Sequence, residues 1–233
     1  MTQPFSGFSQ QGLNFLQQVR IENDKAWFDG NRDIYDRELL APFRALVEQL
    51  APGMLAIDPQ FETRPAIGKT LSRIHRDTRF SHDKSRYRSR MWLTFKRPSK
   101  DWKDAPVYFF ELGPDMLRYG LGYYSANKPT MDLFRHTLKQ RPQPFLEVAA
   151  CCRPPFVLVG ESYKRPLVKE QAAEIATWYN RKSFAVMVTD SEVEKLFSAD
   201  LAPRLAGAFL QLEPLYHWLM QVETMKQIDP ADL

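Results

Sequence analysis

The sequence of 233 residues predicts one α+β domain over residues 1–233, with N-terminal helices and a mostly antiparallel sheet that has helices packed on one side. Two observations favour this fold class. Apolar residues recur at helical spacing in the first third of the chain, and short segments rich in β-branched and aromatic residues follow. The chain has no internal repeat and no glycine- or serine-rich linker, so a single domain is the simpler interpretation.

The N-terminal third is predicted to be helical. Ser9 can cap a first helix, and Asn23 or Asp24 can cap a second one. Pro42 lies inside the second helical pattern and should kink or break it, because proline has no backbone N–H to donate.

The middle of the chain is predicted to form an antiparallel meander. Its candidate strands are 71–75, 91–97, 107–112 and 116–124. The pattern is clearest in the second of these, where apolar and more polar residues alternate. We expect the last three segments to be neighbouring strands of one sheet.

The C-terminal part is predicted to mix helices with short strands. The expected helices are 130–140, 169–179 and 201–222, and the expected strands are 156–160 and 184–189. Ser191 and Glu194 have the spacing of a capping box for a further short helix. Gly120 and Gly122 lack the third glycine of a dinucleotide-binding motif, so they indicate a bulge or a close backbone approach.

Composition excludes several classes of protein. No apolar stretch reaches the roughly 18 residues of a membrane helix, so no membrane partner is expected. The N-terminus lacks the features of a signal peptide, which predicts a cytoplasmic protein. The only cysteines, Cys151 and Cys152, are adjacent on a predicted helix, so we expect them to be reduced and at least partly buried. No cofactor is expected.

Positive charge is concentrated in one part of the sequence. Residues 64–103 contain thirteen Lys or Arg and three Asp or Glu, a net charge of +10, although the whole chain carries +4. The rest of the chain therefore carries −6. Such a basic segment attracts anions, or it pairs with acidic helices elsewhere in the protein.

The densest polar segment is 73–90, with seven basic residues, two aspartates and two histidines. We expect a long loop at one end of the sheet, where arginines can bind phosphate or carboxylate groups. A second basic patch, Lys164 and Arg165, can join it at the same end. The predicted ligand-binding residues are Arg73, Arg76, Arg79, Lys84, Tyr87, Lys164 and Arg165.

The aspartates of this loop, Asp77 and Asp83, leave alternatives open. Either can act as the base of an enzyme that uses a phosphorylated substrate. They can instead fix the turn through backbone hydrogen bonds, and we expect Asp77 to hold a buried or half-buried arginine. A metal site built with His75 and His82 is disfavoured, because the surrounding cations would repel the metal. The preferred function is binding of a phosphorylated or otherwise anionic ligand, and a nucleic-acid-binding module is a further alternative.

The run from Arg76 to Tyr87, with Arg76-Asp77-Thr78-Arg79-Phe80-Ser81, Asp83-Lys84 and Tyr87, resembles the signature of domain-of-unknown-function family 2461 of bacteria and fungi. Further segments that are similar to this family lie along nearly the whole chain: Phe5-x-Gly7-Phe8, Asn23-Asp-Lys-Ala-Trp27-Phe28, Tyr119-Gly-x-Gly122-Tyr123, Lys164-Arg165-Pro166 and Arg181-Lys182-Ser183-Phe184. Ser85, Arg86 and Arg88 depart from the proline and lysine that the family often has there. The resemblance implies one soluble intracellular domain and supplies no mechanism.

Overall fold

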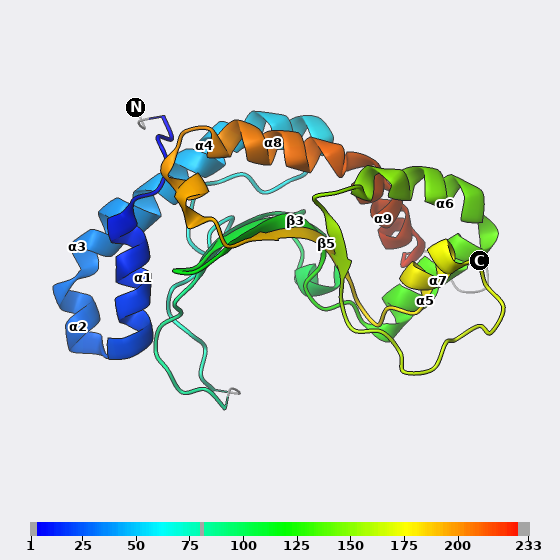
Figure 1. Ribbon diagram of the computed structural model, residues 1–233, viewed down its shortest axis with the longest axis horizontal. Coiled ribbons are helices and arrows are strands. Elements are labelled where there is room, and N and C mark those ends of the chain that lie inside the picture. The colour runs from blue at the N-terminus through cyan, green and yellow to red at the C-terminus, as the bar shows by residue number, and fades with distance from the viewer. Residues whose placement is uncertain (1–3, 80–81, 228–233) are drawn as a thin grey trace. The chain divides into compact units, whose positions relative to one another are not determined.

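The computed structural model describes residues 4–79 and 82–227 of the chain. Its five strands are β1 (Met91–Phe95), β2 (Pro106–Leu112), β3 (Leu117–Tyr123), β4 (Val157–Val159) and β5 (Ala185–Asp190). They form one antiparallel sheet in the order β1-β2-β3-β5-β4 (Figure 1). The predicted α+β fold class is therefore confirmed.

The chain forms two compact units. Unit 1 comprises Met1–Phe95, Phe109–Tyr119 and Thr189–Gly207. Unit 2 comprises Lys96–Tyr108, Gly120–Val188 and Ala208–Leu233. The single domain over 1–233 stays a prediction.

Unit 1 begins with a series of helices, and its caps follow the sequence pattern. The series consists of α1 (Gln10–Glu22), α2 (Lys25–Gly30), α3 (Arg32–Tyr35), the π-helical turn η1 (Asp36–Leu40) and α4 (Ala41–Ile57). Ser9 accepts a hydrogen bond from the N–H of Gly12, and Asp24 accepts one from the N–H of Trp27. Both predicted N-caps are therefore confirmed, the second at Asp24.

Pro42 does not break the helix in which it lies, because helical structure is continuous from α3 through η1 into α4. Without an N–H, Pro42 cannot donate to the carbonyl of Glu38 four residues earlier. The helix widens here by one residue, and the N–H of Ala41 donates to the carbonyl of Asp36. The missing donor is thus accommodated by a π-helical turn.

The three strands in the middle of the chain, β1, β2 and β3, lie where the sequence predicts them. They are neighbours in the sheet. The segment 71–75 forms isolated bridges: Leu71 pairs with Ile67 and, antiparallel, with Leu93, and His75 pairs antiparallel with Tyr87. Four positions separate the two antiparallel bridges on one side of this pairing (75 − 71) and six on the other (93 − 87). A continuous ladder needs equal spacing on both sides, so the predicted fourth strand does not form.

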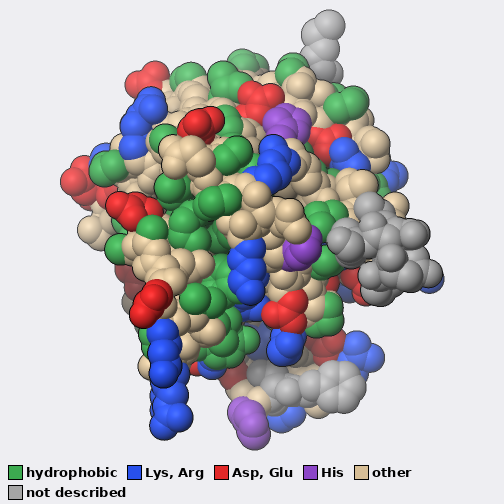
Figure 2. Space-filling view, turned by 90° about the vertical axis from the view of Figure 1, so that its right-hand side faces the viewer, with side chains coloured by type: hydrophobic (Ala, Val, Ile, Leu, Met, Phe, Trp, Pro, Cys, Tyr) green, Lys and Arg blue, Asp and Glu red, His purple; other side chains and the backbone are tan. Residues whose placement is uncertain are grey.

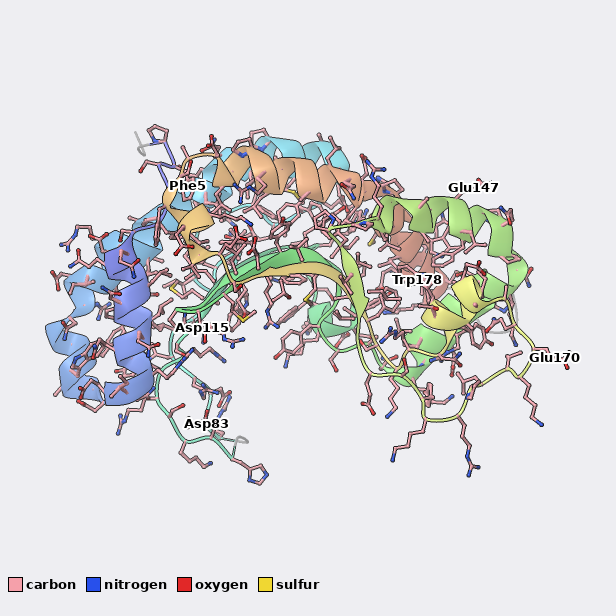
Figure 3. The ribbon with its side chains drawn as sticks, in the orientation of Figure 1. Phe5, Asp83, Asp115, Glu147, Glu170 and Trp178 are labelled. Atoms are coloured by element: carbon pink, nitrogen blue, oxygen red, sulfur yellow. The ribbon has the colours of Figure 1, made fainter. Side chains whose placement is uncertain are left out.

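Unit 2 contains helices that pack around aromatic side chains. They are α5 (Lys128–Gln140), α6 (Pro142–Ala149), α7 (Ala173–Tyr179) and α9 (Glu213–Met225). Trp178 lies 5.2 Å from Phe145 and 5.3 Å from Phe184, ring centre to ring centre, in edge-on geometry. It points into the unit, whereas Glu147 and Glu170 point outward (Figure 3).

Several predicted C-terminal boundaries differ from the structure. The helix expected over 201–222 is two helices, α8 (Leu201–Gln211) and α9, because Pro214 occupies the first turn of α9. The helix expected over 169–179 begins only at Ala173. The Ser191–Glu194 capping box is absent, because Asp190 accepts the N–H of Glu192 before the 3₁₀ turn η4 (Val193–Phe197). Two more 3₁₀ turns are η2 (Trp102–Asp104) and η3 (Ala150–Cys152).

The paired glycines of β3 allow a close backbone approach, as predicted. A Cβ atom on Gly120 would lie 2.1 Å from the carbonyl oxygen of Val186, and one on Gly122 would lie 2.4 Å from the Cα of Ala185. Both positions therefore require glycine for β3 to pair with β5.

The two cysteines are free and partly buried, which confirms the prediction for Cys151 and Cys152. Within the described ranges, no helix combines the length and apolar character needed to cross a bilayer.

Candidate anion-binding site

The basic segment forms a projecting loop whose base is held by backbone hydrogen bonds. The N–H of Arg76 donates to the carbonyl of Arg86, and the N–H of Arg88 donates to the carbonyl of Ile74, both at 2.8 Å. Asp83 lies near the far end of this loop (Figure 3). The loop of the family signature is thus closed at its base within unit 1.

Asn23 joins this base to the N-terminal helices. Its side-chain oxygen accepts the N–H groups of Arg86 (2.6 Å) and Tyr87 (3.0 Å). Its amide donates to the carbonyls of Tyr87 and Val19. The backbone of Asn23 is left-handed, with φ at +38°, a conformation that asparagine tolerates better than most residues. Asn23 therefore ends α1 and also holds the base of the loop.

Tyr87 belongs to the packed base of the loop. Its side chain is 3% exposed, and its ring stacks on Phe28 at 4.3 Å with an interplanar angle of 10°. The ring of His75 lies 5.0 Å away. Tyr87 anchors the loop through these rings. The sequence also predicts that Phe80 anchors the loop, and that residue lies outside the described ranges.

The charged residues of the loop pair with one another at its surface. Asp77 accepts two hydrogen bonds from the guanidinium of Arg79, at 3.0 and 2.8 Å, and Arg76 lies 3.0 Å from Asp83. Lys84 donates to the carbonyl of Thr78. The side chains of Arg79 and Asp77 are 77% and 56% exposed. The expectation that Asp77 holds a buried or half-buried arginine is therefore wrong, because its arginine is solvated.

These contacts keep both aspartates ionised. Hydrogen bonds from Arg79 lower the pKa of Asp77 to about 2. The pKa of Asp83 is lowered by hydrogen bonds from Ser85 and by the charge of Arg76. A carboxylate with so low a pKa is a weak general base at neutral pH.

Arg73 lies beside the loop and lines a cavity of about 200 Å³, which we call the Tyr35 cavity. Its lining consists of Phe28, Arg32, Tyr35, Ile67, Arg73, Ile74 and His75. Arg73 is exposed, and no other described residue forms a hydrogen bond or ion pair with its guanidinium. Arg32 makes one long contact, 3.8 Å to Asp36. Two arginines, Arg73 and Arg32, therefore line one cavity, and their guanidinium groups have few acidic partners among the described residues.

The second basic patch belongs to unit 2. Lys164 and Arg165 are exposed, and they follow Gly160, whose carbonyl accepts a hydrogen bond from Arg181. Lys182 pairs with Glu161. On the face seen in Figure 2, Lys and Arg side chains are interspersed with acidic and hydrophobic ones. The common cleft that joins this patch to the loop stays a prediction.

The candidate metal ligands of the loop, His75, Asp77, His82 and Asp83, do not form a metal-binding group in the structure. Within 4–79 and 82–227, no group of three or more His, Cys, Asp or Glu side chains has an arrangement that could hold a metal ion.

Sequence reasoning missed the residues of the N-terminal helices that complete this region. Tyr35 belongs to a helical apolar pattern and Arg32 is an exposed charge on the same series of helices, so neither gives a separate signal of a cavity. Asn23 and Phe28 did carry a signal, since both lie in a segment that resembles family 2461. The structure brings that segment against the base of the signature loop.

Comparison with known proteins identifies a family. No curated protein matches the chain significantly. Residues 11–218 match the family described as conserved hypothetical protein DUF2461, which confirms the resemblance carried by the motifs. Because the match covers most of the chain, the protein belongs to this family of conserved hypothetical proteins.

Proposed function

We propose that the protein binds a phosphorylated or otherwise anionic small molecule, with Arg73 and Arg32 as the principal contacts beside the signature loop. One observation carries the proposal: these two arginines line one cavity, and Arg73 has no acidic partner among the described residues. Guanidinium groups match the geometry of phosphate and carboxylate oxygens.

The loop supports the proposal through its charge. Its seven basic residues and two aspartates give segment 73–90 a net charge of +5. Arg76, Arg79 and Lys84 are engaged within the loop, so they contribute mainly an attractive field. Lys164 and Arg165 are further candidate contacts for a larger ligand.

The same surface is the basis of two other candidate functions. An enzyme that uses Asp77 or Asp83 as base is less favoured, because the pKa values of both carboxyls are lowered. Nucleic-acid binding would use the same positive charge, and it would show a steep loss of affinity with salt.

The test is the thermal shift caused by inorganic phosphate in three proteins: the parent, Arg73→Ala and Arg86→Ala. With a dissociation constant near 1 mM, about 10 mM phosphate stabilises the parent by about 1.4 kcal/mol. The melting temperature should rise by about 3–6 °C for a chain of this size. Arg73→Ala should lose most of this rise.

Arg86→Ala is the matched control, because Arg86 is an exposed arginine of the same segment that does not line the cavity. It should keep most of the shift. Equal losses in both variants would mean that phosphate senses only the net charge, and the proposed site would be wrong. Tight, strongly salt-dependent binding of any oligonucleotide, without a phosphate shift, would favour the nucleic-acid function instead.

A further inference from the structure

The Tyr35 cavity is large enough for part of a small organic molecule. Its volume is about 200 Å³, and an apolar protein cavity of roughly 150 Å³ is known to take up benzene. The rings of Phe28 and Tyr35 and the aliphatic side chains of Ile67 and Ile74 supply hydrocarbon surface. A phosphate ion alone would leave most of this surface without contacts.

The accessible wall of the cavity is hydrocarbon. Tyr35 is 4% exposed and lines the cavity with its ring, because its hydroxyl is buried from solvent and forms no hydrogen bond with the described residues. Tyr35 therefore offers an apolar surface to a ligand.

Exposed positive charge and hydrocarbon surface therefore belong to the same cavity. Arg32 and Arg73 are exposed, whereas Tyr35 is buried. This arrangement suits a molecule with an anionic group at one end, which stays at the exposed arginines, and an apolar group at the other end, which enters the cavity.

We propose that the ligand is an amphipathic anion: a phosphate or carboxylate attached to an apolar group of about phenyl size. This inference rests on the proposed function, since it assigns the ligand class of the same site. The anionic group contacts Arg73 and Arg32, and the apolar group fills the cavity.

Calorimetric titration with two probes tests the ligand class: inorganic phosphate and phenyl phosphate. Burial of a phenyl ring should make phenyl phosphate bind at least about tenfold more tightly than inorganic phosphate.

Two variants test the contribution of the cavity. Tyr35→Phe removes only the buried hydroxyl and should keep the advantage of phenyl phosphate over inorganic phosphate. Ile67→Trp fills the cavity from a side chain that is 41% exposed, so folding is preserved. It should reduce the advantage of phenyl phosphate over inorganic phosphate to about one.

The outcomes distinguish this inference from the proposed function. If phosphate binds through Arg73 but phenyl phosphate binds no better, the ligand class is wrong and the anion site stands. The same conclusion follows if Ile67→Trp leaves the phenyl advantage intact. If neither probe binds, both the inference and the proposed function are overturned.

Discussion

Asn23 connects two segments of the family signature that are 64 residues apart. Both oxygen and nitrogen of its side-chain amide are used, and three of the four hydrogen bonds go to the backbone of Arg86 and Tyr87. The loop is therefore positioned by a residue outside it. A substitution at Asn23 should therefore disturb the loop without changing any residue within the loop.

Replacing Asn23 tests this connection. Asn23→Gly keeps the left-handed backbone accessible and should destabilise the protein by about 2–3 kcal/mol through the lost hydrogen bonds. Asn23→Ala should cost about 1 kcal/mol more, because alanine disfavours a φ of +38°. Urea unfolding measures both values. Equal and near-zero effects would show that Asn23 does not hold the loop.

Glu223 belongs to a second polar cluster, which lies in unit 2. Its carboxylate lies 2.8 Å from Lys226, and Lys226 also donates to Asp104 at 3.1 Å. Asp104 in turn accepts hydrogen bonds from Asn127 and Thr130. Burial raises the pKa of Glu223 above its ordinary value, and this effect exceeds the opposing attraction of Lys226.

This shift predicts a pH dependence. Below the ordinary pKa of 4.5, Glu223 is protonated in both the folded and unfolded states and contributes nothing to the pH dependence. As the pH rises above 4.5, the unfolded state ionises first, so Glu223 lowers the stability of the folded state. Glu223→Gln removes this loss. The gain in the free energy of unfolding of the variant over the parent should therefore be larger at pH 7 than at pH 4, as measured by urea unfolding. A smaller gain at pH 7 would contradict the raised pKa.

The sequence could identify some site residues and not others. Arg73 is conspicuous because it belongs to a dense run of positive charge. Tyr35 is not, because its position on a helical apolar pattern is that of an ordinary core residue. Its hydroxyl is buried without a hydrogen-bond partner among the described residues, and only the three-dimensional packing places Tyr35 in the lining of the same cavity as two arginines.

At the level of elements, strands were predicted better than helix boundaries. Alternating apolar and more polar side chains mark β1 in the sequence, although four of its five residues are buried in the structure. The break between α8 and α9 was missed, since apolar spacing continues across it and only Pro214 marks the new start. The two-residue mismatch between the bridges at 71–75 depends on pairing, which local pattern does not specify.

The pairing of β3 with β5 gives a further prediction. Gly120→Ala places a methyl group 2.1 Å from a backbone oxygen, so the strands must separate. We expect a loss of about 3 kcal/mol or more in the free energy of unfolding, or failure to fold.

Gly53→Ala is the matched control, because Gly53 lies in α4 with no atom within 4 Å of an added Cβ. It should stabilise the protein by about 0.5–1 kcal/mol through better helix propensity. Similar effects at both glycines would show that β3 and β5 do not approach as closely as described.

At the scale of the whole molecule, charge is separated along the chain. Residues 64–103 carry +10 and the remainder carries −6. Much of the positive charge in the signature loop is paired locally, with Asp77 and Asp83. Under the proposed function, the net charge attracts anions from solution, and Arg73 and Arg32 are proposed to bind them at a defined place.

The location of a bound anion tests this account most directly. Crystals soaked with tungstate, a heavy-atom mimic of phosphate, would reveal the anion by anomalous diffraction. The account predicts a peak within hydrogen-bonding distance of the guanidinium of Arg73, at the Tyr35 cavity, and its loss in Arg73→Ala crystals. A peak confined to Lys164 and Arg165, or to the Arg76 and Arg79 side chains of the loop, would contradict the assignment of Arg73 as the principal contact.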